Sequence, residues 1–93
     1  MADMTSAHAV ISGRVQGVYF RMETRTAAER YNVLGWVRNK SDGTVEAVFE
    51  GDKSAVDAVL NWCRKGPPMS HVFDVDVTWG DYSGSFDSFD IRY

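Results

Sequence analysis

The spacing of hydrophobic and polar residues changes several times along the chain, and each change marks a new element. The segment over residues 7–14 is short, contains neighbouring β-branched residues and ends near a glycine, and these features predict a strand. From Phe20 the apolar positions recur at helical spacing with charged residues between them, so we expect an amphipathic helix ending near Asn32. We expect residues 1–6 to form a flexible N-terminal tail outside one domain of residues 7–93.

The remaining elements repeat this order. Beyond the first helix, we expect strands over 34–38 and 44–50, a helix over 53–65, and strands over 71–79 and 89–93. The two middle strands are joined by a turn that ends in Asp42-Gly43, a typical hairpin sequence. Two split βαβ units predict an α+β fold, the ferredoxin-like βαββαβ sandwich, in which an antiparallel sheet carries both helices on one face. Because this fold serves many functions, it selects none of them.

The composition is that of an ordinary globular domain, with 93 residues, 44% of them hydrophobic and 25% charged. No apolar run approaches the roughly 18 residues of a membrane span, and the N-terminus lacks the basic and apolar regions of a secretion signal. We therefore expect a cytoplasmic protein with no membrane partner. Cys63 lies on the apolar stripe of the second predicted helix, which indicates a buried hydrophobe rather than a nucleophile.

The net charge of -3 is unevenly distributed. Residues 1–46 hold six Lys/Arg and five Asp/Glu, a charge of +1, whereas residues 47–93 hold four and eight, a charge of -4. A nucleic-acid binder normally has a broad basic face, so we expect no nucleic-acid partner. An anionic ligand stays open if the cations of the first half converge on one spot.

The stretch from Gly13 to Arg21 lies between the first strand and the first helix, where an anion site can form. A tight loop at a helix N-terminus gathers backbone N–H groups into a concave nest, and the helix dipole adds partial positive charge. Gly17 permits a positive φ and a close approach of the backbone. Arg21, in the first helical turn, carries a planar fork suited to two phosphate oxygens. A plain strand–helix connection with a solvated arginine explains the same residues equally well.

A second stretch, from Gly35 to Gly51, places Asn39 at the mouth of the predicted hairpin. The commoner role of an asparagine there is an Asx turn that starts the bend. If the second strand lies beside the first, Asn39 faces the loop that precedes the first helix instead.

Together the two stretches resemble the paired signatures of the acylphosphatase family. The first reads Gly-x-Val-Gln-Gly-Val-x-Phe-Arg, and the second reads Gly-Trp-Val-Arg-Asn-x-x-x-Gly-x-Val-x-x-x-x-x-Gly, both without a gap. The resemblance covers residues 8–93. It implies an enzyme that hydrolyses a small-molecule acyl phosphate to a carboxylate and inorganic phosphate, with no cofactor, no metal and no covalent intermediate. We expect a monomer, since nothing in the sequence demands a larger assembly.

The resemblance also implies a role for particular residues. The arginine that holds phosphate in the family falls on Arg21, and the asparagine that orients the attacking water falls on Asn39. The implied phosphate-binding residues are Val15, Gln16, Gly17, Val18, Tyr19, Phe20 and Arg21. In some relatives the terminal carboxylate pairs with the active-site arginine, which makes the carboxylate of Tyr93 a candidate partner of Arg21.

One arginine and one asparagine suffice for the chemistry of an acyl phosphate. Phosphoryl transfer passes through a loose transition state, so catalysis is mostly positioning and electrostatics. The leaving group is a carboxylate whose conjugate acid has a pKa of about 4, so it departs without a proton donor. An asparagine that accepts a hydrogen bond from the water then replaces a strong base. The same argument predicts poor activity on alkyl phosphate monoesters, whose alkoxides need a proton.

Two other functions stay open. A ferredoxin-like sheet that displays aromatic residues on its open face can bind RNA, although the strand over 44–50 is acidic where such a module is basic. The same phosphate cradle can also serve a non-catalytic phosphate-sensing or protein-interaction domain. The presence of both Arg21 and Asn39 disfavours that second alternative.

Overall fold

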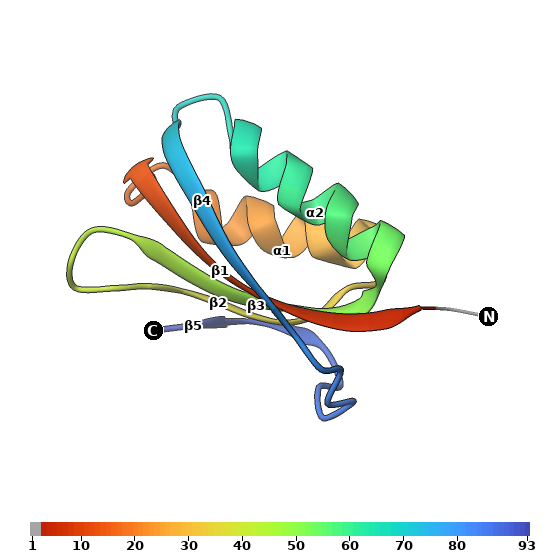
Figure 1. Cartoon of the computed structure of the whole chain (residues 1–93). Coiled ribbons are helices and arrows are strands. Elements are labelled where there is room, and N and C mark those ends of the chain that lie inside the picture. Colours follow the sequence, from red (N-terminus) through yellow and green to blue (C-terminus); the bar gives the residue numbers. More distant parts are fainter. Residues whose placement is uncertain (1–2) are drawn as a thin grey trace.

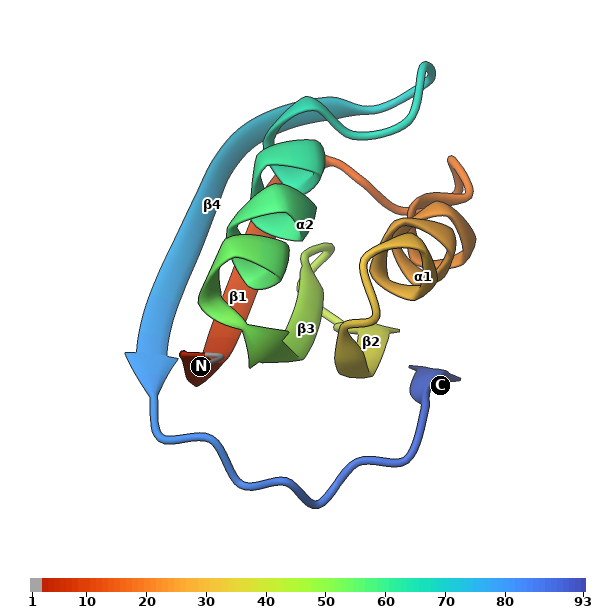
Figure 2. The same cartoon turned by 90° about the vertical axis from the view of Figure 1, so that its right-hand side faces the viewer.

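A computed structural model of the chain describes residues 3–93 and arranges them in two layers, a five-stranded sheet and a pair of helices (Figure 1). The elements are β1 (Met4–Arg14), α1 (Phe20–Arg30), β2 (Leu34–Asn39), β3 (Val45–Asp52), α2 (Lys53–Lys65), β4 (His71–Gly80) and β5 (Phe89–Arg92). Both helices cover the same face of the sheet, as the view along the strands shows (Figure 2). The predicted ferredoxin-like α+β sandwich is confirmed.

The sheet is mixed, which corrects the prediction of an antiparallel sheet. Its strands lie in the order β4-β1-β3-β2-β5, and all neighbours pair antiparallel except β2 and β5, which run parallel. The connection over residues 81–88 leaves β4 at one edge and passes beneath the sheet to the other edge, where β5 begins (Figure 2). A short alternating segment has no feature that reports its direction, so the sequence did not predict this pairing.

The first strand begins earlier than predicted. β1 starts at Met4, where it pairs with β3, and the backbone N–H of Lys53 donates to the carbonyl of Asp3 at 2.9 Å. Residues 4–6 are therefore part of the sheet, and the predicted tail is wrong for them. Residues 1 and 2 of that tail lie outside the described residues.

The helices follow their predicted patterns closely. α2 has the predicted bounds, whereas α1 ends at Arg30, two residues before the predicted end. There Asn32 takes a left-handed backbone with φ of 58°, and the N–H of Val33 turns back to the carbonyl of Ala28 at 2.9 Å. In residues 3–93, no helix combines the length and the apolar character needed to cross a membrane.

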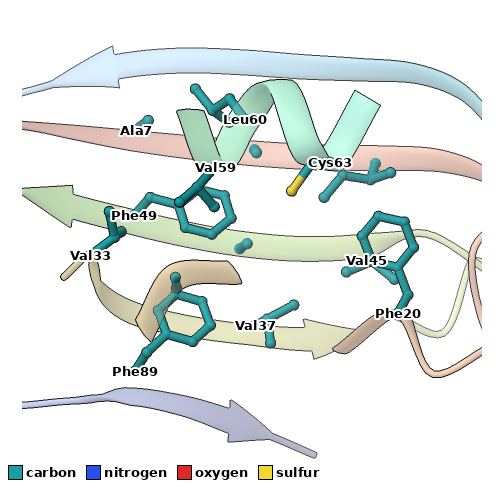
Figure 3. Packing of buried hydrophobic residues seen from close by; sticks show 14 of the residues in the cluster. Ala7, Phe20, Val33, Val37, Val45, Phe49, Val59, Leu60, Cys63 and Phe89 are labelled. Atoms are coloured by element: carbon teal, nitrogen blue, oxygen red, sulfur yellow. The ribbon is translucent and has the colours of Figure 1, made fainter. Parts of the chain in front are cut away.

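The core lies between the helices and the face that they cover (Figure 3). Small residues on the inner face of the central strands leave room for α2; these are Ala7, Ala9 and Ala47. Phe89 stacks on Phe49 with ring centroids 5.6 Å apart, and this contact joins β5 to the core. Cys63 is fully buried, and burial raises the pKa of its thiol to about 12, so it packs as a hydrophobe, as predicted.

Candidate active site

Three segments that are distant in the sequence meet at one end of the molecule: the loop between β1 and α1, the β2–β3 hairpin, and the C-terminus (Figure 1). A cavity of about 320 Å³ opens between them. Its walls are formed by Val15, Gly17, Tyr19, Phe20, Arg21, Met22, Asn39, Ile91 and Tyr93. The fold thus brings Arg21 and Asn39, from the two signature stretches, into the same cavity.

The loop before α1 has the backbone shape of an anion nest. Gly17 has φ of 74°, and a Cβ built there would meet no atom within 4 Å, so the backbone conformation rather than the space requires glycine. The first helical hydrogen bond runs from the N–H of Glu23 to the carbonyl of Tyr19 at 3.0 Å. Within the described chain, the backbone N–H groups of residues 16–22 donate no hydrogen bond. They are available to an anion, which the dipole of α1 also favours.

Tyr19 has an unexpected backbone conformation. It occupies the N-cap position of α1 with φ of 63° and ψ of 23°, and no side-chain hydrogen bond caps the helix. A left-handed conformation costs a non-glycine residue of order 1–2 kcal/mol. Such strain is concentrated at functional sites, where it serves the local geometry. Here it turns the backbone toward the cavity and leaves the Tyr19 ring 74% exposed at the rim.

Arg21 lies half-buried in the first turn of α1. Its guanidinium carbon is 4.8 Å from the centroid of the Tyr93 ring, a cation–π contact. Among residues 3–93, Arg21 forms no ion pair, and the terminal carboxylate of Tyr93 is therefore not its partner in this structure. The last residue reaches the arginine with its ring instead. The N–H groups of the guanidinium are left for a ligand.

Asn39 ends β2 and lines the cavity, while a neighbouring residue closes the hairpin. The Oδ1 atom of Asp42 accepts hydrogen bonds from the backbone N–H and the hydroxyl of Thr44, at 3.0 and 2.6 Å. These bonds lower the pKa of the Asp42 carboxyl. The Asx-type role that was the alternative for Asn39 thus belongs to Asp42. In the described part of the chain, the side chain of Asn39 makes no hydrogen bond, so its amide is free to meet a ligand or a water.

The predicted phosphate-binding residues divide between the cavity and its support. Val15, Gly17, Tyr19 and Phe20 line the cavity together with Arg21. The side chain of Val18 is 5% exposed and belongs to the core. Gln16 turns its side chain toward the hairpin, where Nε2 donates to the carbonyls of Lys40 and Thr44 at 2.7 and 2.9 Å.

Two residues of the cavity, Met22 and Ile91, were not predicted from the sequence, and Tyr93 was predicted only as a partner of Arg21 through its terminal carboxylate. Met22 follows Arg21 in the first turn of α1, so its position beside Arg21 in the sequence was a signal that it lies near the cavity. Ile91 and Tyr93 come from the C-terminal end of the chain, and they reach the cavity because β5 lies beside β2. No feature of the sequence indicates that position for β5.

The family model for acylphosphatases matches residues 7–91. The chain is 54% identical over 87 residues to an acylphosphatase of Pelotomaculum thermopropionicum, an alignment that covers 94% of this chain and 95% of the relative. It is 47% identical to an acylphosphatase of an Anaeromyxobacter species (strain Fw109-5) over the whole of both chains. The chain belongs to the acylphosphatase family.

The solved acylphosphatase structures have the same fold. The crystal structure of the acylphosphatase from Bacillus subtilis superposes with a TM-score of 0.92 at 34% identity, over 96% of this chain and 99% of that one. In this acylphosphatase-family chain, residues 3–93 contain no group of three or more His, Cys, Asp or Glu side chains that could hold a metal ion. The cavity offers one guanidinium, a row of backbone N–H groups and one side-chain amide, a set suited to a tetrahedral anion and a neighbouring water.

Proposed function

We propose that this protein is an acylphosphatase, which hydrolyses the carboxyl–phosphate bond of acyl phosphates to a carboxylate and inorganic phosphate. The observation that carries the proposal is the meeting of Arg21 and Asn39 in one cavity, above a loop whose N–H groups are free to bind an anion. An acyl phosphate dianion and one water yield a carboxylate and a dihydrogen phosphate monoanion, so atoms and charge balance.

In this proposal, Arg21 and the N–H groups of residues 16–21 hold the phosphate. The guanidinium binds two phosphate oxygens with parallel N–H donors, and the nest binds the third. These donors are already in place before the substrate arrives, and they face the oxygens that carry charge in the loose transition state. The cradle therefore stabilises the transition state without moving.

Asn39 orients the water in this proposal. Its side-chain oxygen accepts a hydrogen bond from the water and directs it at phosphorus, on the side opposite the acyl oxygen. The carboxylate departs as an anion without a proton donor, and the water proton passes to a phosphate oxygen. The step forms one P–O bond and breaks another, and it needs no metal and no covalent intermediate.

The rim of the cavity is apolar, and we propose that it receives the acyl group. Tyr19, Met22 and Tyr93 line the cavity and are 74%, 51% and 96% exposed. An acyl chain or ring that covers these side chains removes apolar surface from water. We further propose that the protein acts as a cytoplasmic monomer on small-molecule substrates.

The open face of the sheet gives little support to the alternative of RNA binding. Glu46 and Glu50 point to this face from the central strand β3. The guanidinium of Arg38 donates to Glu46 at 2.6 Å, and His8 is hydrogen-bonded to the same carboxylate at 2.7 Å. The charge of Arg38 is partly neutralised within the protein, which weakens its attraction for phosphates.

The test is hydrolysis of an aromatic acyl phosphate in the presence of EDTA, by wild type, Arg21→Ala and Asn39→Ala. We expect metal-free turnover by wild type. Arg21→Ala should lower kcat/KM by roughly 10³-fold or more and raise KM, because the charge that holds the phosphate is gone. Asn39→Ala should lower kcat by roughly 10²-fold or more with KM nearly unchanged, because only the water is affected.

An alkyl phosphate monoester is the matched control substrate, since it offers the same phosphate with a poor leaving group. We expect it to turn over far more slowly than the acyl phosphate. Equal rates on the two substrates would contradict the mechanism. A folded wild type that binds inorganic phosphate but hydrolyses neither would instead favour a phosphate-sensing domain.

A further inference from the structure

One contact joins the two halves of the cavity directly. The side-chain amide of Gln16 lies between two backbone carbonyls of the β2–β3 hairpin and donates to both, to Lys40 at 2.7 Å and to Thr44 at 2.9 Å. Gln16 precedes Gly17 in the loop before α1, and Lys40 follows Asn39 in the sequence. Two hydrogen bonds thus connect the loop that carries the anion nest to the hairpin that carries the water-orienting amide.

These two carbonyls close the neck of the hairpin. The N–H of Lys40 donates to the Thr44 carbonyl at 2.8 Å, and the N–H of Gly43 donates to the Lys40 carbonyl at 3.2 Å. A carbonyl oxygen has two lone pairs, so each can accept a second bond, and the amide of Gln16 supplies both. The two protons of a primary amide suit this pair of acceptors, whereas a carboxylate has no proton to donate and a thioether has none either.

The backbone of Asn39 is held by the pairing of β2 with β3, opposite Val45, but its side chain has no anchor of its own within residues 3–93. Its side chain makes no hydrogen bond within residues 3–93, so its position depends on where the hairpin backbone lies. The hairpin extends beyond the sheet at this end, where the turn residues 41–43 are exposed (Figure 1). A misplacement of about 1 Å at a reacting group can cost roughly 10²-fold in rate.

We propose that Gln16 is a positioning residue for the hydrolytic reaction: its side-chain amide holds the β2–β3 hairpin, and with it Asn39, at a fixed distance from the phosphate loop. The inference rests on the proposed function for its consequence on catalysis. The side chain of Gln16 contributes no contact to the phosphate. Its backbone N–H remains part of the nest in any side-chain variant.

The test uses Gln16→Met, which keeps the length of the side chain and removes its donors without adding a charge beside the anion nest. We expect kcat for an aromatic acyl phosphate to fall roughly 10- to 100-fold, while the inhibition constant of inorganic phosphate stays within about threefold. Asp42→Ala is the matched control, because it removes the turn bonds to Thr44 and leaves the Gln16 bonds in place. We expect its kcat to stay within about threefold of wild type.

Two results would overturn the proposal. Unchanged kcat in Gln16→Met would show that the two hydrogen bonds from Gln16 to the hairpin have no catalytic role. A weakening of phosphate binding in parallel with the fall in kcat would place Gln16 in phosphate binding itself. A purely structural role would lower the melting temperature and leave kcat of the folded enzyme unchanged.

NMR of the wild type and of Gln16→Met separates this proposal from the proposed function. In wild type, we expect slow exchange of the Gln16 amide protons and contacts from them to Lys40 and Thr44. In Gln16→Met, we expect increased backbone motion at residues 39–44 while the core is unchanged. If these contacts are absent, or if the hairpin is equally rigid in the variant, the positioning role of Gln16 is overturned, whether or not a substrate is hydrolysed. If the contacts are present but no acyl phosphate is hydrolysed, only the proposed function is overturned.

Discussion

Two loops of this protein gather backbone N–H groups, and they differ in whether the protein supplies the anion. In the β4–β5 loop, the carboxylate of Glu50 accepts hydrogen bonds from the N–H of Ser83 at 3.1 Å, the hydroxyl of Ser83 at 2.9 Å and the N–H of Gly84 at 3.1 Å. In the loop before α1, the N–H groups of residues 16–22 have no acceptor among residues 3–93. The same donors therefore hold the fold together in one loop and remain without an acceptor in the other.

The two loops lie at different ends of the molecule (Figure 1). Glu50 is 3% exposed and lies on the central strand β3, so its carboxylate anchors the β4–β5 loop as it passes the sheet. That loop leads into β5, whose Ile91 and Tyr93 form one wall of the cavity. The hydrogen bonds to Glu50 thus stabilise the β4–β5 loop, and this loop leads to the C-terminal segment that lines the cavity. A buried carboxylate with its donors satisfied adds rigidity, while unsatisfied donors keep a site ready for a ligand.

Removal of the internal anion should have the largest effect on stability. Glu50→Ala is expected to lower the free energy of unfolding by about 2–3 kcal/mol, because several charge-assisted hydrogen bonds are lost together. Urea denaturation at pH 7 measures this change. Asp57→Ala is the control, since Asp57 forms only an exposed i,i+4 pair with Lys53 and should matter by less than about 0.5 kcal/mol. Equal effects of the two variants would show that Glu50 does not anchor the loop.

Addition of an external anion should stabilise the other loop by a smaller amount. Inorganic phosphate at ten times its Kd is expected to add about 1.4 kcal/mol to the free energy of unfolding, since it binds only the folded state. The shift should vanish in Arg21→Ala and persist in Glu50→Gln. Thermal unfolding with phosphate, against chloride at the same ionic strength, measures it. An equal shift in Arg21→Ala would place the bound phosphate elsewhere.

The contribution of Glu50 to the pH dependence of stability should be the smallest of these effects. Burial raises the pKa of Glu50, but the hydrogen bonds from Ser83 and Gly84 oppose this effect, and the pKa lies below its usual value. A carboxyl with a lowered pKa in the folded state contributes stability at neutral pH, and this is lost as the pH falls below about 4.5 toward the folded-state pKa. Urea unfolding of wild type and Glu50→Gln between pH 7 and 3 should show that the difference between them shrinks in acid. A constant difference would refute this linkage.

Local features of the sequence were enough to predict most of the fold and the centre of the candidate site. The apolar stripe of α2 has one dominant period, and its predicted bounds of 53–65 match the structure. Gly17, in the loop before α1, adopts the positive φ that its position suggested, since only local sterics decide that preference. The two signature stretches indicated Arg21 and Asn39 as a pair, although their catalytic roles stay a proposal.

The path of the chain in space decided the rest. Strand β5 lies parallel to β2 because the preceding loop crosses the sheet, and this places the Tyr93 ring, rather than the terminal carboxylate, against Arg21. Gln16 meets the hairpin and Glu50 meets Ser83 across 24 and 33 sequence positions or more. Hydrophobic periods encode which face of an element is buried, and turn residues encode local backbone angles. Neither encodes which distant donor will meet a given acceptor, because that depends on how all the elements pack together.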